Sequence, residues 1–343
     1  MEKAALQSVT SAAGARPEDL WPLLKDVSRS FYRTLRVLPA PVRQQIGLAY
    51  LLARATDTIA DTEIVPPAQR LEALHDLRQR ILGERTAPLA FSELARHQGS
   101  HGERLLLQNC EVYLELLWKM SEADLKLVRQ VLDVITGGQE LDLRRFASTN
   151  SQNIVALQAD AELDDYTYRV AGCVGEFWTR ICRAHLFPSA PIDDTFLLNN
   201  GRRFGQGLQL VNILRDLPVD LRNGRCYLPM EELVASDLMP KDLLLPATEP
   251  RFRSLYAKYL DRAETHLRAG WEYTNALPRG CVRVRLACAW PILIGRGTLN
   301  CLRKGNVLDP AQRIKISRSE VRRILFRSVL LYPFPGPWKR MAD

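Results

Sequence analysis

The sequence of 343 residues lacks the short motifs that mark several large classes of enzyme. It has no GxGxxG, no GxxxxGK[ST] and no GxSxG, which argues against a Rossmann dinucleotide site, a P-loop and an α/β-hydrolase nucleophile. It also lacks an apolar signal core at its start and any apolar run of about 18 residues. We therefore expect neither secretion nor a membrane-spanning helix.

Cysteine and histidine are present but form no metal-binding pattern. The seven cysteines include no CxxC pair and stand mostly in apolar surroundings, so we expect reduced packing residues in a cytoplasmic protein. The five histidines lie away from the acidic motifs described below, which makes zinc a poor fit. The net charge of +8 favours anionic partners, but charge alone does not choose among nucleic acid, acidic lipid and phosphorylated small molecules.

The sequence has almost no alternation of apolar and polar residues at period two, whereas Ala, Leu, Arg and Glu are abundant. This composition predicts an all-α protein. No linker, charge block or repeat divides the chain, so we expect a polar tail over residues 1–17 and one domain over 18–343. The last segment, 329–343, mixes aromatic and basic side chains, and it either docks on the body or forms an interfacial foot on a membrane.

The stretch of residues 209–228 contains a helix that carries a narrow polar stripe on an otherwise apolar surface. Helical periodicity places four polar residues on this stripe: Gln209, Asn212, Asp216 and Asp220. We expect the stripe to face inward, where two carboxylates need a cation. Pro218 is expected to stop or kink the helix between the aspartates, before a turn at residues 222–225.

A second helix, expected over residues 43–61, repeats the pattern with Tyr50, Arg54, Asp57 and Asp61. One pair of carboxylates four residues apart is a weak signal, but two such pairs on apolar helices suit Mg²⁺ that is completed by substrate phosphates. Arg54, Arg215 and Arg225 would then bind a diphosphate. The alternative is a helical scaffold in which the stripes are buried ion-pair networks and the basic surface binds partners.

Stabilising a diphosphate leaving group allows an allylic ester to ionise, and the resulting cation needs dry aromatic walls. Candidates for those walls are Phe31, Tyr50, Tyr166 and Phe204. In the helix expected over 164–186, Gly172 and Gly175 leave room for another backbone or for a long apolar ligand. The residues alone thus indicate Mg²⁺-dependent ionisation of a prenyl diphosphate.

Four segments together resemble the squalene/phytoene synthase family. They are SRSF (28–31), YLLARATDTIAD (50–61), YTYRVAGCVG (166–175) and QLVNILRDLPVDLRNGR (209–225). The resemblance covers roughly residues 25–317. It implies a single isoprenoid-synthase helical bundle in which the two aspartate helices face each other across a central channel.

The resemblance also implies roles for single residues. The metal ligands would be Asp57, Asp61, Asp216 and Asp220. The substrate contacts would be Ser28, Arg29, Phe31, Tyr50, Arg54, Val170, Gly175, Gln209 and Asn212. At the reacting centre would lie Arg215, Arg225 and Tyr166, which matches a position proposed in the family for proton handling.

The reaction implied by the resemblance joins two farnesyl diphosphates head to head to presqualene diphosphate, which NADPH then reduces to squalene. The segment RIKISRSEV (313–321) resembles squalene-forming members, and Lys315, Arg29, Arg54 and Arg215 would contact NADPH. The alternatives are a dehydrosqualene or phytoene product without NADPH, or release of presqualene diphosphate. No nucleic acid and no obligate protein partner is expected, and contact with a membrane would be peripheral.

The sequence departs from the family pattern at four positions. Ala60 and Val219 stand where the family often has an acid, and Pro218 is unusual inside the second aspartate motif. Ser317 stands where a second NADPH-linked arginine is expected. These departures bear on how many metal ions are bound and on the reductive step.

Overall fold

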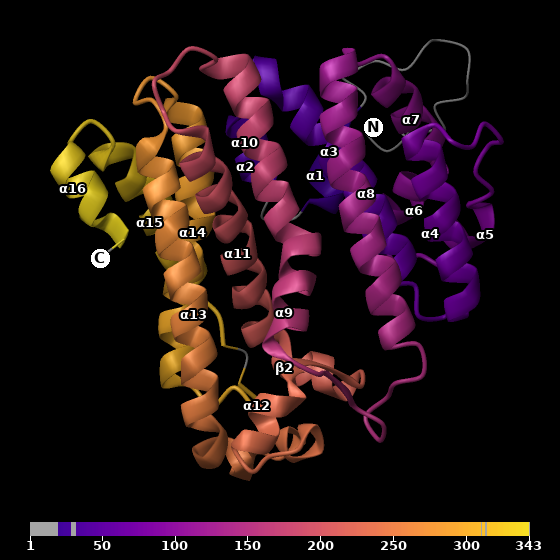
Figure 1. Cartoon of the computed structure of the whole chain (residues 1–343), viewed down its shortest axis with the longest axis vertical. Helices are drawn as coiled ribbons and strands as arrows, with labels where there is room; N and C mark the ends of the chain where they lie inside the picture. Colours follow the sequence, from indigo (N-terminus) through magenta and orange to yellow (C-terminus); the bar gives the residue numbers. More distant parts are fainter. Residues whose placement is uncertain (1–19, 29–31, 310, 313, 343) are drawn as a thin grey trace, which may run out of the picture. The chain divides into compact units, whose positions relative to one another are not determined.

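The computed structural model describes residues 20–28, 32–309, 311–312 and 314–342, and these residues are mostly helical (Figure 1). The predicted all-α class is confirmed. Contacts divide the chain into two compact units, one of Met1–Tyr32 and Arg43–Thr136, the other of Arg33–Val42 and Gly137–Asp343. The expected tail of residues 1–17, together with Arg29 and Phe31, lies outside the described residues.

The first unit consists of helices and the turns between them. They are α1 (Leu20–Val27), α3 (Ala40–Ala60, without its first turn), α4 (Pro67–Leu82), α5 (Ser92–Arg96), α6 (His101–Gln108), α7 (Cys110–Trp118) and the first part of α8 (Glu122–Arg145). Ser121 accepts a hydrogen bond from the backbone N–H of Asp124 at 3.2 Å and so caps α8. The apolar side of α3 is buried through Leu48, Leu52 and Ile59.

The second unit contains longer helices and a small sheet. Its regular elements are α2 (Tyr32–Val37, from its second residue), the end of α8, β1 (Val155–Leu157), α9 (Asp160–Thr167), α10 (Cys173–Leu186), α11 (Asp194–Arg222), β2 (Arg225–Pro229), α12 (Met230–Ala235), α13 (Glu249–Ala276), α14 (Val282–Lys304), α15 (Arg318–Leu331) and α16 (Pro335–Lys339). Short 3₁₀ turns are η4 (Pro240–Leu244), η5 (Pro246–Thr248) and η6 (Arg340–Ala342). A π-helical turn, η3 (Tyr168–Gly172), joins α9 to α10.

Helix α11 is the element around which the second unit is packed. It lies between α10 and α13, and it also contacts α14 (Figure 1). Its apolar residues Leu210, Leu214 and Leu217 belong to the largest hydrophobic cluster of this unit, together with Tyr256 and Tyr259 of α13. The helix is therefore held on its apolar side, which leaves the polar stripe as its other side.

Pro218 does not end α11, so of the two outcomes expected from the sequence, a stop or a kink, the stop is wrong. The helix continues through Pro218 to Arg222. Proline has no N–H to donate to the carbonyl four residues earlier, which is that of Leu214. The hydroxyl of Tyr256 on α13 donates to this carbonyl at 2.9 Å instead. The neighbouring helix thus supplies the missing hydrogen bond, and Asp216 and Asp220 stay on one continuous helix.

The helix expected over residues 164–186 is interrupted by the π turn η3, which the sequence did not predict. Glycines let α10 and η3 approach the backbone of α11. A β-carbon at Gly175 would lie 1.8 Å from the carbonyl oxygen of Gly201, and one at Gly205 would lie 2.0 Å from that of Ala171. The space beside Gly175 is therefore filled by another backbone, the first of the two interpretations above.

The two-stranded parallel sheet is the main feature that the all-helical prediction did not include. Val155 pairs with Arg225 and Ala156 with Cys226. The predicted turn after α11 is confirmed. Glycine suits position 224 there because φ is 80° and because a β-carbon would lie 2.3 Å from the backbone nitrogen of Asn150. The turn and the sheet fix Arg225 directly after the aspartate helix.

The end of the chain docks on the body through its aromatic residues. Trp338 is buried, its ring stacks on Trp271 at 5.2 Å, and its indole N–H donates to Asn275 at 2.9 Å. Tyr332 packs edge-on against Trp338. No helix within the described residues is both long and apolar enough to cross a membrane. All seven cysteines are free thiols, as predicted.

Candidate active site

The polar stripe of α11 is open to solvent rather than buried, which corrects the expectation that it faces away from water. The Asp216 side chain is 46% exposed, Asn212 is exposed, and Gln209 and Asp220 are partly exposed. Carboxylates on this side keep much of their hydration, so they need no buried counter-ion to exist there. The stripe is consequently accessible to a ligand.

Arg215 lies beside the first aspartate of this stripe. Its Nε donates to Asp216 at 2.8 Å, and a second guanidinium nitrogen pairs with the other carboxylate oxygen, so the contact is bidentate. This hydrogen bonding raises the pKa of Arg215, despite partial burial. The side chain is 37% exposed and stays a cation available to an anionic ligand.

On α3, Arg54 is held between two carboxylates of its own unit, Asp57 and Glu103. Burial lowers the pKa of Arg54, but the two carboxylates outweigh burial and the net pKa is raised. Asp61 is exposed one turn further on, and its N–H still donates to the carbonyl of Asp57 at 2.9 Å. The predicted stripe therefore shares one helical side. Glu103 was missed because it lies on α6, far along the sequence.

The donor set fits Mg²⁺ in its chemistry. Each stripe has two carboxylates four residues apart, at least partly exposed, and Mg²⁺ is commonly held by one or two carboxylates with waters and substrate phosphates completing its shell. Within the described residues no group of three or more His, Cys, Asp or Glu side chains forms a site by itself. The pairs belong to different units, and their meeting at one channel stays a prediction.

Tyr166 stacks on Tyr227, a residue that the sequence analysis missed. The ring centroids lie 4.6 Å apart, and the hydroxyl of Tyr227 donates to Asp142 at 2.9 Å. Burial raises the pKa of Asp142 to about 6, although Tyr227, Arg225 and Arg145 act against that rise. Tyr227 and Asp142 thus fix one face of the Tyr166 ring. An acid between two leucines on α8 was the only signal for Asp142 in the sequence.

The other predicted site residues differ in whether the structure places them near the stripes. Ser28 is buried at the end of α1, where its hydroxyl donates to Leu24, rather than at the start of the next helix. Phe204 lies on the side of α11 away from the aspartates, with its ring against Gly270 of α13, so it is not a wall beside them. Tyr50 is partly exposed on α3, and Val170 is partly exposed within η3.

Lys315 lies in an extended segment that packs on α14. Ile314 and Ile316 insert against Gly305 and Gly297, where a β-carbon would lie 2.5 Å and 2.6 Å from their terminal methyl groups. Lys315 between them is exposed. Ser317 caps α15 by accepting from the N–H of Glu320 at 3.2 Å. The role of Lys315 toward NADPH stays a prediction.

The fold and the two stripes define an all-α isoprenoid synthase, and comparison with known proteins specifies which kind. The model of the squalene/phytoene synthase family matches residues 24–320, so the chain belongs to this family. It is similar to a presqualene diphosphate synthase of Rhodopseudomonas palustris, at 30% identity over 74% of this chain and 77% of that protein.

Two further similarities extend the comparison. A bifunctional lycopene cyclase/phytoene synthase of Blakeslea trispora is 28% identical over 80% of this chain, which spans only 43% of that relative's length. The solved structure of TcSQS with a bound ligand shares the fold with a TM-score of 0.75, at 21% identity over 95% of this chain and 88% of that one. The members of this family are head-to-head prenyl synthases, and they differ in their product.

Proposed function

We propose that this protein joins two farnesyl diphosphates head to head to presqualene diphosphate in a Mg²⁺-dependent reaction, and reduces this intermediate to squalene with NADPH. The observation that carries the first step is the accessible Asp216/Asp220 stripe on an unbroken helix, with Arg215 beside it. The matching Asp57/Asp61 stripe on α3 supports it.

The residues divide the work of ionisation between them. Asp57, Asp61, Asp216 and Asp220 would hold Mg²⁺, which supplies electrostatic stabilisation to the departing diphosphate. Arg54 and Arg215 are kept protonated by their carboxylate neighbours and would share the negative charge of the diphosphate. Tyr166, fixed on one face by Tyr227, would present its hydroxyl beside the leaving group.

A second candidate is a synthase that releases presqualene diphosphate without reducing it. The observation that favours it is Ser317, which stands in place of an expected arginine and is engaged in capping α15. Lys315 alone then supplies the positive charge on that segment between Ile314 and Ser317. The similarity to a presqualene diphosphate synthase points the same way.

Product analysis distinguishes these functions. Purified protein is incubated with farnesyl diphosphate and Mg²⁺, with and without NADPH, and the lipids are identified. Squalene only with NADPH supports the full reaction, whereas presqualene diphosphate in both incubations supports the second candidate. Dehydrosqualene in both would refute the reductive assignment.

The aspartate stripes have their own test. We expect Asp57→Asn and Asp216→Asn each to abolish turnover while circular dichroism stays unchanged. The matched control is Asp261→Asn, which removes a 69% exposed carboxylate of α13 and should leave turnover intact. Mg²⁺ with diphosphate should raise the unfolding temperature of the wild type but not of the two stripe variants. Full activity in both variants would show that the stripes are structural.

A further inference from the structure

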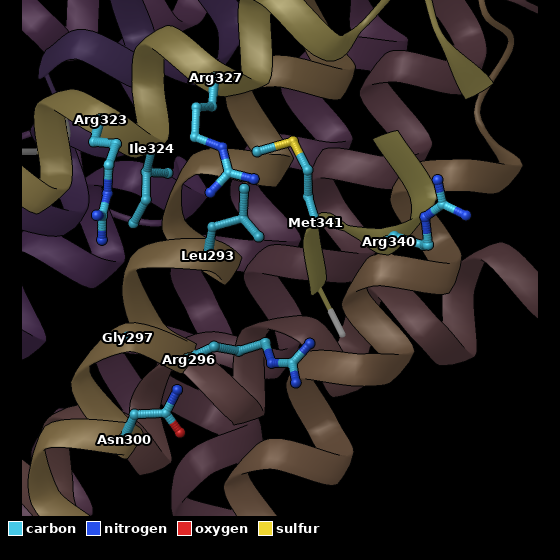
Figure 2. A pocket seen from close by; sticks show the side chains of 9 residues that line it. All are labelled: Leu293, Arg296, Gly297, Asn300, Arg323, Ile324, Arg327, Arg340 and Met341. Atoms are coloured by element: carbon cyan, nitrogen blue, oxygen red, sulfur yellow. The ribbon is translucent and has the colours of Figure 1, made fainter. Parts of the chain in front are cut away.

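A pocket of about 400 Å³ lies between α14, α15 and the last residues of the chain, and no predicted site residue lines it. Four of its lining residues are arginines: Arg296, Arg323, Arg327 and Arg340. Apolar side chains, among them Leu293 and Met341, complete the lining. Figure 2 shows Arg323 and Arg327 directed from α15 toward α14. The pocket is therefore both strongly basic and partly apolar.

The positive charge of this pocket is only partly balanced. Arg296 pairs with Glu264 at 3.0 Å, but that carboxylate also pairs with Arg303. The Arg323 side chain is 67% exposed, and its guanidinium nitrogen lies 3.9 Å from the Glu320 carboxylate oxygen, which is a loose ion pair. Over the described ranges, no carboxylate pairs with Arg327 or Arg340. Arginines that line one pocket without enough carboxylates favour an anion, and the guanidinium fork suits a phosphate group.

The outward side of α15 continues the same combination of charge and apolar surface. Phe326 is 69% exposed, and Val329 and Leu330 are each 55% exposed. Helical periodicity places Arg322 on the same side, and it is exposed as well. The only acid of this helix is Glu320, which is engaged in the cap at Ser317. Figure 1 shows α15 and α16 at an edge of this unit.

The chemistry of this surface selects among partners. Nucleic acid would use the arginines but would leave Phe326 and Leu330 in water, because a phosphate backbone offers no apolar surface to cover them. The interface of an anionic bilayer accommodates both, since headgroup phosphates pair with arginines while apolar side chains enter the acyl boundary. A helix with this mixture of exposed arginine and apolar residues is typical of interfacial binding.

We infer that α15 and its arginine pocket form a docking site for an anionic phospholipid bilayer, with a lipid phosphate in the pocket and Phe326, Val329 and Leu330 in the interface. This site goes beyond the proposed reaction and does not depend on it. It overlaps the C-terminal foot considered from the sequence, but the aromatic residues Tyr332 and Trp338 of that segment pack against the protein itself.

The test measures how the full chain partitions onto vesicles by co-sedimentation. Vesicles contain equal parts of phosphatidylglycerol and phosphatidylcholine, or phosphatidylcholine alone. We expect binding to the anionic vesicles only, weakened by salt. Arg323→Gln/Arg327→Gln should weaken it about 25-fold, since one basic residue near an anionic surface contributes roughly fivefold. Phe326→Ser/Leu330→Ser should weaken it by about tenfold or more through lost apolar insertion.

The matched control is Arg180→Gln/Arg268→Gln, which removes the same charge from exposed positions on α10 and α13. It should change partitioning by no more than about threefold, because these positions contribute only to the general field. Equal losses in both arginine pairs, or no binding of the wild type to anionic vesicles, would overturn the docking site. Calorimetry with inorganic phosphate is a further measurement. The pocket would be assigned to a soluble anion instead if phosphate binding is saturable and if Phe326→Ser/Leu330→Ser leaves vesicle binding unchanged.

Discussion

The hydrogen bond from Tyr256 to the carbonyl of Leu214 should be the reason why α11 tolerates Pro218. Both Tyr256 and Leu214 are 1% exposed, so water cannot replace this donor. Tyr256→Phe removes the donor and leaves a buried carbonyl without its partner, which costs about 1–3 kcal/mol. We therefore expect Tyr256→Phe to lower the free energy of unfolding by roughly 2 kcal/mol.

Pro218→Ala tests the cause, because alanine restores the backbone N–H at this position. That N–H can donate to the carbonyl of Leu214, so Tyr256→Phe should cost only about 0.5–1 kcal/mol in the Pro218→Ala background. The coupling free energy between the two sites is then about 1–1.5 kcal/mol. Pro218→Ala alone should stabilise the protein by less than the roughly 3 kcal/mol that separates proline from alanine inside a helix. Tyr256 already satisfies the carbonyl of Leu214, and proline also lowers the unfolded-state entropy by about 0.4–1 kcal/mol.

The assay is urea unfolding of the four proteins in this cycle, followed by circular dichroism and by tryptophan fluorescence. Tyr259→Phe provides the matched control, since its hydroxyl also leaves α13 but donates to Asp160 at 2.9 Å. Its cost should be the same in both backgrounds. If Tyr256→Phe costs as much with alanine at position 218 as with proline, the hydroxyl does not compensate for the proline and the reasoning is wrong.

Three further predictions concern other parts of the chain. Gly205→Ala should destabilise the protein by about 3 kcal/mol or more in urea unfolding, because the added β-carbon would lie 2.0 Å from the carbonyl oxygen of Ala171. Gly280→Ala is the control, since a β-carbon there meets open space. Burial in the folded state raises the pKa of Asp142 to about 6, so the folded protein keeps a proton that the unfolded chain releases near pH 4. The free energy of unfolding should therefore fall by roughly 2 kcal/mol as the pH rises from 4 to 6.5. Asp142→Asn should abolish that decrease. Glu103→Gln leaves Asp57 as the carboxylate that pairs with Arg54. It should raise KM for the proposed substrate, farnesyl diphosphate, with a smaller effect on kcat. An unchanged KM would exclude a role for Glu103 in positioning Arg54.

The sequence by itself determined the class of fold and predicted the content of the candidate site. Apolar periodicity marks α3 and α11, and the same periodicity singles out the polar side chains that break it. The i, i+4 spacing puts Asp216 and Asp220 on one side whenever that helix forms, and carboxylate chemistry then indicates Mg²⁺. Such inferences depend only on neighbours along one helix, so local sequence is sufficient for them.

The tertiary structure alone decided what depends on contacts between distant segments. Sequence rules stop or kink a helix at Pro218, but Tyr256, 38 residues away, supplies the missing donor and the aspartates stay on one helix. Glu103 reaches Arg54 from another helix, and Asp142 reaches Tyr227 from α8. Phe204 had the right chemistry for an aromatic wall but lies on the far side of α11 from the stripe. Each outcome follows from packing between helices, which periodicity within one helix does not encode.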